Sequence, residues 1–295
     1  MSTSMSSVVY AIFLGAMILF NMVGNSMVCI VVLKNKAMRT SINWLLFYLA
    51  IADVLVAVFF TPCILSHFIK LPSGIVGDML CKFLMGGAFG WASASASSFL
   101  LVLIAFERYH ATLHPLKMLS RGRSLRLVPV LWIVAILLAA PMVLLFIYQK
   151  EIQACEIVFP NYLTSRFYHL IWSCCNEFLP ICIMGYLYTR IVLCLRERSL
   201  ISASSQTKVL HSRHKVTRML ILVSVIFVLC WTPSAVLCAL TPLVPGHRVT
   251  VDKVAEASAL LNSCLNPLLY TLHSQQFRRN LASLFSFSRR ERKTK

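Results

Sequence analysis

Residues 42–68 read INWLLFYLAIADVLVAVFFTPCILSHF, a stretch that is apolar almost throughout and carries one acidic residue, Asp53. A helix of about 20 apolar residues spans the hydrocarbon core of a bilayer. The rest of the chain has the same character, because hydrophobic residues make up 58% of its 295 positions and charged residues only 13%. A soluble protein carries about twice that charged fraction. This composition predicts an integral membrane protein.

Six further segments are apolar enough, or nearly so, to cross a bilayer. We expect the seven spans at residues 8–33, 42–68, 79–109, 127–148, 168–195, 216–240 and 254–272. Helices are favoured over a barrel because each run is continuously apolar, whereas the strands of a barrel alternate in short segments. The expected fold is an all-α membrane protein, a seven-transmembrane helix bundle over residues 8–272, preceded by a short segment, 1–7, with no cleavable signal.

The basic residues predict how the spans are oriented. A net charge of +18 suggests nucleic acid at first sight. However, 22 of the 28 Lys and Arg residues fall on one side of the predicted spans, within 34–39, 108–126, 190–218 and 278–295. Short cytoplasmic loops carry such an excess. We therefore expect an extracellular N-terminus, a cytoplasmic C-terminus, anionic membrane lipids as neighbours of the basic residues, and no nucleic acid partner.

The segment after the last span has the pattern of a surface helix. Phe277, Leu281 and Leu284 recur at helical spacing, while Arg278 and Arg279 fall on another face. Such a pattern indicates a short amphipathic helix lying on the membrane surface. We therefore expect residues 273–295 to form an amphipathic helix and a basic cytoplasmic tail.

The carboxylate of Asp53 needs polar partners, because an ionised carboxylate at the centre of a membrane helix costs about 2.5–3.5 kcal/mol. Other polar residues at mid-membrane depth are Asn25, Ser97, Asn262, Ser263 and Asn266. We expect these residues to surround Asp53. The alternating Ala and Ser of residues 92–98 let other helices approach closely, which predicts that the third span lies at the centre of the bundle.

Five of the spans contain a proline, which removes a backbone donor and permits a kink. These residues are Pro62, Pro141, Pro180, Pro233 and Pro267. Their distribution indicates a bundle that can flex.

In order and over essentially the whole chain, these residues resemble the motifs of class A, rhodopsin-like G-protein-coupled receptors. The motifs are Gly24-Asn25 with Val28, Leu49-Ala50-Ile51-Ala52-Asp53, Glu107-Arg108-Tyr109, Pro115-Leu116, Trp132, Pro180 with Tyr188, Cys230-Trp231-Thr232-Pro233 and Asn266-Pro267-Leu268-Leu269-Tyr270. The resemblance implies a plasma-membrane receptor, not an enzyme, that converts binding of an extracellular ligand into activation of a heterotrimeric G protein, with arrestin as a further partner.

The resemblance also implies an activation switch. Its residues are Glu107, Arg108, Tyr109, Tyr188, Trp231, Pro233, Asn266, Pro267 and Tyr270. Arg108, paired with Glu107 at rest, is expected to meet Tyr188 and the G protein when the sixth helix moves outward around Pro233. Trp231 is expected to sense the ligand from below, and Tyr270 to rotate inward in the active state.

Two further features follow from the same resemblance. Cys81 and Cys155 are expected to form a disulfide that ties the second extracellular loop to the third helix. A sodium ion is expected as an allosteric effector, without any other cofactor, because hard cations prefer oxygen ligands. The sodium ligands implied are Asp53, Ser97, Asn262, Ser263 and Asn266.

The chain departs from the family pattern at two points. Cys81 lies 27 residues before Arg108, about two more than is usual in the family, so we expect a bulge or a later start in the outer third helix. Arg213 stands near the base of the sixth helix, where some members carry an acidic partner for the triplet arginine. We therefore expect a weak resting lock and measurable basal signalling.

Comparison with the family narrows the ligand. The depth at which amine receptors carry an aspartate is occupied near Gly90 and Trp91, which argues against a monoamine. The depth at which photopigments carry a lysine is occupied by Leu260, while Lys253 lies at the outer mouth, which argues against an opsin.

Two carboxylates remain in the outer half of the bundle, Glu177 and Glu256. With Trp91, Trp231 and the nearby aromatic residues Trp172 and Phe178, they are candidates to bind an arginine or amine of a ligand by charge-assisted bonds. The loop at 155–160 also resembles the one that follows the disulfide in neuropeptide receptors. We therefore expect a neuropeptide agonist.

Other functions are less well supported. A small non-peptide ligand, an amine or a lipid-like molecule, is the main alternative within the same class. A transporter or channel would need polar stripes on several helices, whereas the polar residues here converge on one cluster. An enzyme would need a nucleophile with its base, or a metal cluster, and the sequence has no motif of that kind.

Overall fold

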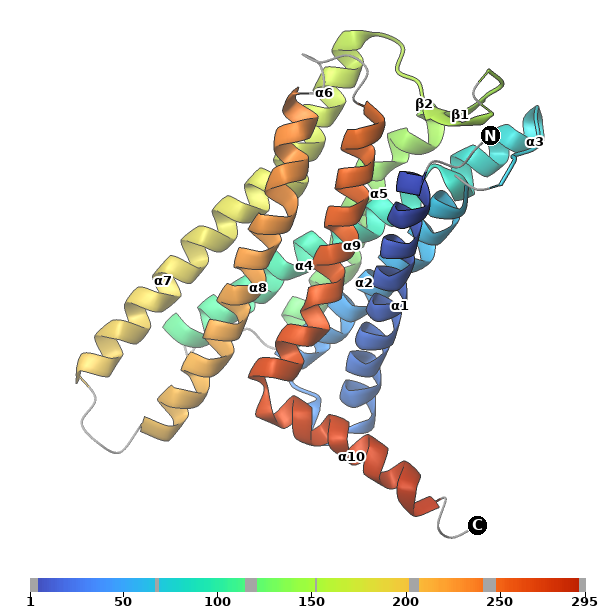
Figure 1. The fold of residues 1–295 in the computed structure, drawn as a ribbon. Helices are drawn as coiled ribbons and strands as arrows, with labels where there is room; N and C mark the ends of the chain where they lie inside the picture. Colours follow the sequence, from blue (N-terminus) through green and yellow to red (C-terminus); the bar gives the residue numbers. More distant parts are fainter. Residues whose placement is uncertain are drawn as a thin grey trace.

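A computed structural model describes residues 5–66, 69–114, 121–151, 153–201, 207–240 and 248–291. These residues form a bundle of long helices that run between the same two ends of the molecule (Figure 1). The long helices are α1 (Met5–Lys34), α2 (Ser41–Ser66), α4 (Ala88–Leu113), α5 (Arg121–Leu145), α7 (Leu179–Ile201), α8 (Thr207–Leu240) and α9 (Arg248–His273). The predicted seven-helix bundle is therefore confirmed.

Two of these helices are extended through π-helical turns at the end of the bundle away from His273, which is called the outer end below. A short helix, α3 (Ile75–Leu80), continues through a π-helical turn at Cys81–Met85 towards α4. In the same way, α6 (Tyr162–Ser173) continues through a π-helical turn at Cys174–Phe178 into α7. A π-helical turn inserts one extra residue and shifts the faces of the helix that follows. A single 3-10 turn, Lys36–Met38, joins α1 to α2.

Among the described residues, six helical stretches are long and apolar enough to cross a membrane. They are Val8–Lys34, Ser41–Ser66, Ile75–Leu113, Ser124–Leu145, Tyr162–Glu197 and Arg218–Leu237. The remaining long helix, α9, is the more polar one, and its Asn262, Ser263 and Asn266 are at most 3% exposed. Its polar residues therefore face the interior, where they do not meet lipid.

The ends of several predicted spans are wrong, and a local cause explains two of them. Residues 146–148, predicted as helix, belong to strand β1 (Phe146–Gln149), which pairs antiparallel with β2 (Ala154–Ile157) and places Tyr148 opposite Cys155. The β-branched and aromatic side chains of β1 favour a strand once a partner is present. The fifth span begins at Tyr162, six residues earlier than predicted, because the Oδ1 of Asn161 caps the helix by accepting a bond of 2.8 Å from the Thr164 N–H.

The third helical stretch is the central one. About 72% of its membrane-spanning core is buried, compared with 22–44% for the other five apolar stretches, and α4 passes obliquely through the middle of Figure 1. Every residue from 92 to 98 is buried, whereas the flanking Trp91 is only partly buried. The prediction that its small residues admit neighbouring helices is confirmed. Phe60 of α2 packs directly on Gly90.

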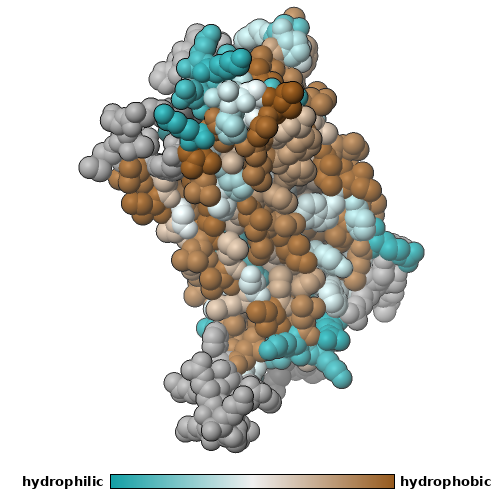
Figure 2. Space-filling model, turned by 90° about the vertical axis from the view of Figure 1, so that its right-hand side faces the viewer, coloured by the Kyte–Doolittle hydropathy of each residue, from teal (hydrophilic) through white to brown (hydrophobic). Residues whose placement is uncertain are grey.

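The outer surface of the bundle is suited to lipid. Large apolar side chains such as Leu137 of α5 and Leu229 of α8 are 66% and 67% exposed. Figure 2 shows hydrophobic side chains along the length of the bundle, with hydrophilic ones gathered towards its ends. In water such a surface would aggregate. The chain is therefore a multi-pass membrane protein.

The predicted amphipathic helix is present as α10 (Gln275–Glu291), which turns away sharply from α9 and crosses the end of the bundle near α1 (Figure 1). The Ser274 hydroxyl caps it by accepting a 3.1 Å bond from the Phe277 N–H. Phe277 is buried, and Leu281 packs against the core, whereas Arg278 and Arg279 are exposed. The two faces are those that the sequence predicts.

Replacing Gly90 by Ala is expected to destabilise the bundle. A Cβ at this position would lie 2.8 Å from two ring carbons of Phe60, which is itself fully buried. Overpacking of this kind costs about 1–3 kcal/mol. We therefore expect a lower midpoint of thermal unfolding in detergent. Gly15→Ala in α1 is the matched control, because nothing lies within 4 Å of its added Cβ. Equal midpoints for both variants would contradict the packing described.

Candidate functional site

A buried polar cluster joins α2, α4 and α9 around Asp53. The Asp53 side chain is 0% exposed. Its Oδ1 accepts a 2.8 Å hydrogen bond from the Ser97 hydroxyl, and its Oδ2 accepts one of 2.7 Å from Asn266 Nδ2. Each carboxylate oxygen therefore has a donor from a different helix. These contacts replace part of the hydration that Asp53 loses in the membrane.

The cluster extends to α1 through Asn25. Its Nδ2 donates to Ser263 O at 3.1 Å and to Asn21 Oδ1 at 3.0 Å. On the same helix, a Cβ at Gly24 would lie 3.0 Å from the ring of Pro267, so glycine lets α1 approach α9 closely. Sequence reasoning missed Asn21, although it lies one turn before Asn25 on the same face.

The cluster also contains oxygen atoms suited to a cation. The Ser263 hydroxyl lies within hydrogen-bonding reach of Asp53, and Asn262 and Ser263 are 3% and 1% exposed. Within the described residues, Asn262 Oδ1 is buried without a hydrogen-bond partner. A carboxylate, two hydroxyls and amide oxygens form a donor set that fits a hard cation such as sodium.

At the opposite end of α4, the Glu107 side chain of the Glu107-Arg108-Tyr109 triplet is held by α5. Glu107 is 6% exposed, and its Oε2 accepts a 2.5 Å hydrogen bond from the hydroxyl of Ser124, which is 1% exposed. Ser124 belongs to no motif and stands in a basic stretch, so no pattern in the sequence pointed to it. The resting pair between Glu107 and Arg108 stays a prediction.

Tyr188 of α7 lies between the triplet and α8. It is 6% exposed and lies near Ser224 of α8 and near the charge of Arg108. The Ser224 hydroxyl donates to Met184 Sδ of α7 at 3.4 Å and to Leu220 O at 3.2 Å. An outward movement of α8 would therefore separate Ser224 from Tyr188. Pro115 and Leu116 lie outside the described residues, as does the side chain of Arg213.

Three tryptophans form a chain of ring contacts in the outer half of the bundle. Trp91 lies with its ring centroid 6.0 Å from that of Trp172 and 6.5 Å from that of Trp231. Trp231 is 2% exposed and continues the chain to Phe227 at 6.0 Å. The structure thus brings Trp91, Trp172 and Trp231 together. A displacement of the Trp172 or Trp91 ring can therefore be passed to the buried Trp231 ring of α8 through ring contacts.

Glu177 occupies the π-helical turn Cys174–Phe178. It is 2% exposed, and within the described residues its Oε2 has no hydrogen-bond partner, although Ser173 interacts with the carboxylate. A buried carboxylate oxygen without a partner is costly. Phe178, expected beside it, is 54% exposed and has no ring contact with the tryptophans in the described chain.

Glu256, the second predicted ligand residue, is held by the neighbouring helices. Its Oε2 accepts from the Tyr10 hydroxyl at 3.3 Å, and its Oε1 accepts from the Cys63 thiol at 3.2 Å. The Lys253 ammonium lies 5.4 Å from the centre of the Tyr10 ring. These contacts join the outer ends of α1, α2 and α9. Sequence reasoning missed Tyr10 and Cys63, which have no family motif.

The predicted disulfide between Cys81 and Cys155 is present, with the two Cα atoms 5.3 Å apart. It ties β2 to the π-helical turn at the outer end of the third helix. The Tyr148 N–H of β1 donates a second tether, a 2.9 Å bond to Asp78 Oδ1. The hairpin is therefore attached at both strands.

The unusual spacing between Cys81 and Arg108 is accommodated as predicted. The π-helical turn at Cys81–Met85 inserts an extra residue, and the chain then breaks at Gly86 and Gly87 before α4 begins. Gly87 has a φ of +74°, a conformation that favours glycine. A Cβ at Gly86 would lie 2.7 Å from the Phe146 ring. The glycine pair thus lets the hairpin pack against the bend.

The structure combines a seven-helix membrane bundle, a buried polar cluster, a hairpin tethered by a disulfide and the Glu107-Arg108-Tyr109 triplet. This combination is typical of one class of membrane receptor. The family model described as 7 transmembrane receptor (rhodopsin family) matches residues 24–270. The chain belongs to this family.

Similar proteins include several receptors named for peptides. The chain is 28% identical over 288 residues to the allatostatin-A receptor of Bombyx mori, covering 92% of this chain and 77% of that receptor. It is 28% identical over 297 residues to the neuropeptide FF receptor 2 of Rattus norvegicus, covering 92% and 70%. It is 29% identical over 294 residues to the C-X-C chemokine receptor type 5 of Homo sapiens, covering 91% and 74%.

The contact between Ser124 and Glu107 can be measured in a double-mutant cycle. We expect the variants Ser124→Ala, Glu107→Ala and the double variant to give a coupling of about 1.5–3 kcal/mol in thermal unfolding, the value for a hydrogen bond to a charged group. Ser95→Ala is the control. Ser95 lies on α4 and is buried like Ser124, but its hydroxyl makes no hydrogen bond within the described residues. Additive effects of Ser124→Ala and Glu107→Ala would show that the contact is absent.

Proposed function

We propose that this receptor binds an extracellular neuropeptide and activates a heterotrimeric G protein. One observation carries the proposal. The buried carboxylate of Glu177 has an oxygen without a partner in the described structure and lies in the helix that carries Trp172. The relatives named for peptides support the same conclusion.

The ligand group that fits this environment is cationic. An arginine or amine would give Glu177 Oε2 the donor it lacks, in a charge-assisted hydrogen bond. The neighbouring tryptophan rings favour a cation over their faces. Glu256 contributes less in this proposal, since Tyr10 and Cys63 already occupy both of its oxygens.

The buried face of α8 would transmit the signal. Trp231, Phe227, Ser224 and Leu220 follow each other at spacings of three and four residues, so they lie on one face, and all are at most 9% exposed. Displacement of Trp231 by the ligand would therefore move Ser224 away from Tyr188. In this mechanism the part of α8 that precedes Pro233 swings away from the bundle. Arg108 and Tyr188 then meet, and Tyr270 rotates inward.

The receptor would lie in the plasma membrane with its N-terminus outside. The supporting observation is that Lys34, Lys36, Arg39, Arg278 and Arg279 are exposed at the end of the bundle where α10 lies. The same end would receive the G protein and, after activation, arrestin. A second candidate ligand is a small amine, because one carboxylate beside aromatic rings also suits a single ammonium group.

The Asp53 cluster would bind a sodium ion. Asp53, Ser97, Asn262, Ser263 and Asn266 would supply its oxygen ligands, and the ion would supply a positive charge that stabilises the resting arrangement of these helices. The buried Asn262 Oδ1, which lacks a partner in the described residues, supports this proposal.

The direct test uses the purified chain reconstituted with G proteins. A library of cationic peptides and small amines is screened for ligand-dependent guanine-nucleotide exchange. Exchange with peptides supports the proposal, and exchange with amines alone supports the second candidate. Solute flux or chemical turnover without nucleotide exchange would overturn both.

Replacement of Glu177 by Gln is expected to lower agonist potency about 10- to 100-fold, the range for loss of a charge-assisted hydrogen bond of about 1.5–3 kcal/mol. The side chain keeps its volume but loses its charge. The concentration for half-maximal nucleotide exchange is the measurement. Glu151→Gln is the control, because Glu151 is exposed in the hairpin turn. An unchanged potency in Glu177→Gln would rule out this carboxylate as the ligand's partner.

Asp53→Ala is expected to abolish any dependence of agonist binding on sodium. Agonist affinity is measured as sodium chloride replaces potassium chloride at constant ionic strength, so that electrostatic screening does not change. The unmodified chain should lose affinity as sodium rises, and the variant should not. A sodium dependence that survives in Asp53→Ala would refute the proposed site.

A further inference from the structure

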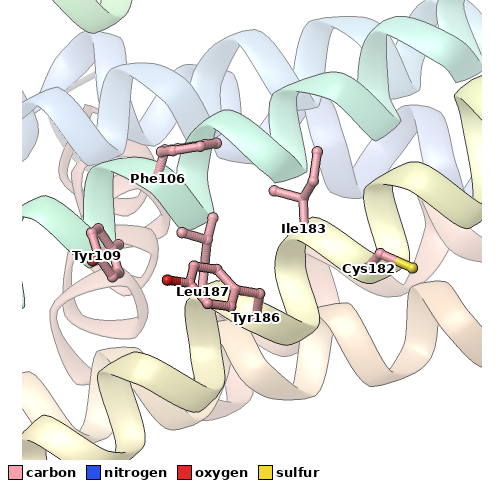
Figure 3. A pocket seen from close by; sticks show the side chains of 6 residues that line it. All are labelled: Phe106, Tyr109, Cys182, Ile183, Tyr186 and Leu187. Carbon is pink, nitrogen blue, oxygen red and sulfur yellow. The ribbon is translucent and has the colours of Figure 1, made fainter.

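A groove opens on the lateral, lipid-facing surface of the bundle between α4 and α7. It is lined by Phe106 and Tyr109 from α4 and by Cys182, Ile183, Tyr186 and Leu187 from α7, as Figure 3 shows. Its volume is about 480 Å³, within the range of sites that hold a small molecule. Phe106 and Tyr186 are 42% and 58% exposed at its edges.

The groove opens towards lipid. Its lining belongs to the membrane-spanning stretches Ile75–Leu113 and Tyr162–Glu197, and it lies in the half of the bundle that ends at the basic side. The side chains of Phe106, Ile183 and Leu187 make its lining mostly apolar. A hydrocarbon chain of the surrounding bilayer is therefore the occupant that fits its interior.

A cationic group stands at the inner mouth of the groove. Arg190 is exposed one turn further along α7 from Tyr186. Its Nη1 lies 3.5 Å from the Tyr186 hydroxyl oxygen, and its Cζ lies 6.0 Å from the centre of the Tyr186 ring. An arginine binds phosphate groups through paired N–H donors. The groove thus has an apolar interior and a phosphate-binding end.

The groove is also next to the switch. Tyr109 belongs to the Glu107-Arg108-Tyr109 triplet, and Leu187 directly precedes Tyr188 on α7. An occupant that touches both helices would stabilise their present separation, because its contacts are made only in this arrangement. Binding at the groove would therefore bias the switch.

We propose that the groove between α4 and α7 binds one acyl chain of an anionic phospholipid of the inner leaflet, with its phosphate on Arg190 and the Tyr186 hydroxyl. The charge of Arg190 selects an anionic lipid over a neutral one. The site is separate from the outer ligand pocket, and its existence does not depend on which ligand the receptor binds.

Photolabelling of the full chain in lipid nanodiscs tests the site. The probe is phosphatidylglycerol with a diazirine on one acyl chain, and labelled peptides are identified by mass spectrometry. We expect adducts on residues 106–109 and 182–187. Arg190→Gln should reduce labelling about fivefold, the contribution of one basic side chain at an anionic membrane surface, and Arg190→Lys should restore part of it.

Two further variants separate the site from general attraction to the leaflet. Ile183→Trp fills the groove and should remove the adducts while the thermal midpoint is unchanged. Arg278→Gln on α10 is exposed at the same end of the bundle and should leave the adducts as they are. The proposal would be overturned if Arg190→Gln and Ile183→Trp were labelled as strongly as the unmodified chain. Loss of labelling on addition of a sterol at constant phosphatidylglycerol would also overturn it.

A signalling measurement tests the coupling and rests on the proposed function. Nucleotide exchange is compared in phosphatidylcholine nanodiscs with and without phosphatidylglycerol. We expect phosphatidylglycerol to change basal exchange in the unmodified chain but not in Arg190→Gln. Labelling without a change in exchange would retain the lipid site and overturn its coupling. Absence of any exchange, with labelling intact, would contradict the proposed function and leave the site standing.

Discussion

The arrangement of the bundle depends on how one carboxylate is satisfied away from water. Asp53 accepts one hydrogen bond from α4 and one from α9, so the three helices can approach only with Ser97 and Asn266 turned inward. In lipid, apolar surface does not drive helices together, and packing and hydrogen bonds must do so. The polar composition of α9 is explained in part by this constraint, because Ser263 and Asn266 are buried and hydrogen-bonded to α1 and α2. A substitution that removes the carboxylate changes the relation of all these helices at once.

Much of the fold follows from the length of apolar runs, because the thickness of the bilayer sets a minimum length for each span. The ends of the helices do not follow. The strand at Phe146–Gln149 forms only because β2 pairs with it and the Cys81–Cys155 disulfide holds β2 nearby. Sequence periodicity carries no information about such distant partners. The early start of the fifth helix depends on a cap at Asn161, a local signal that apolar length alone does not contain.

The candidate site divides in the same way. The partners of Asp53 were predictable because any polar residue at that depth must find another. Ser124 was not, since a single hydroxyl in a basic stretch is ordinary until the fold brings it to Glu107. Glu177 and Glu256 look equivalent in the sequence, yet one keeps an oxygen without a partner in the described structure while the other is engaged by Tyr10 and Cys63. The difference arises from tertiary packing.

The two tethers of the outer hairpin have a consequence for how fast and how tightly a ligand binds. With Cys155 bonded to Cys81 and the Tyr148 N–H bonded to Asp78, neither strand has to become ordered when a ligand arrives. The free energy of contact is then not spent on immobilising a loop. A flexible peptide would meet a rim that is already in its final shape, so the ordering entropy of the complex would come almost entirely from the peptide.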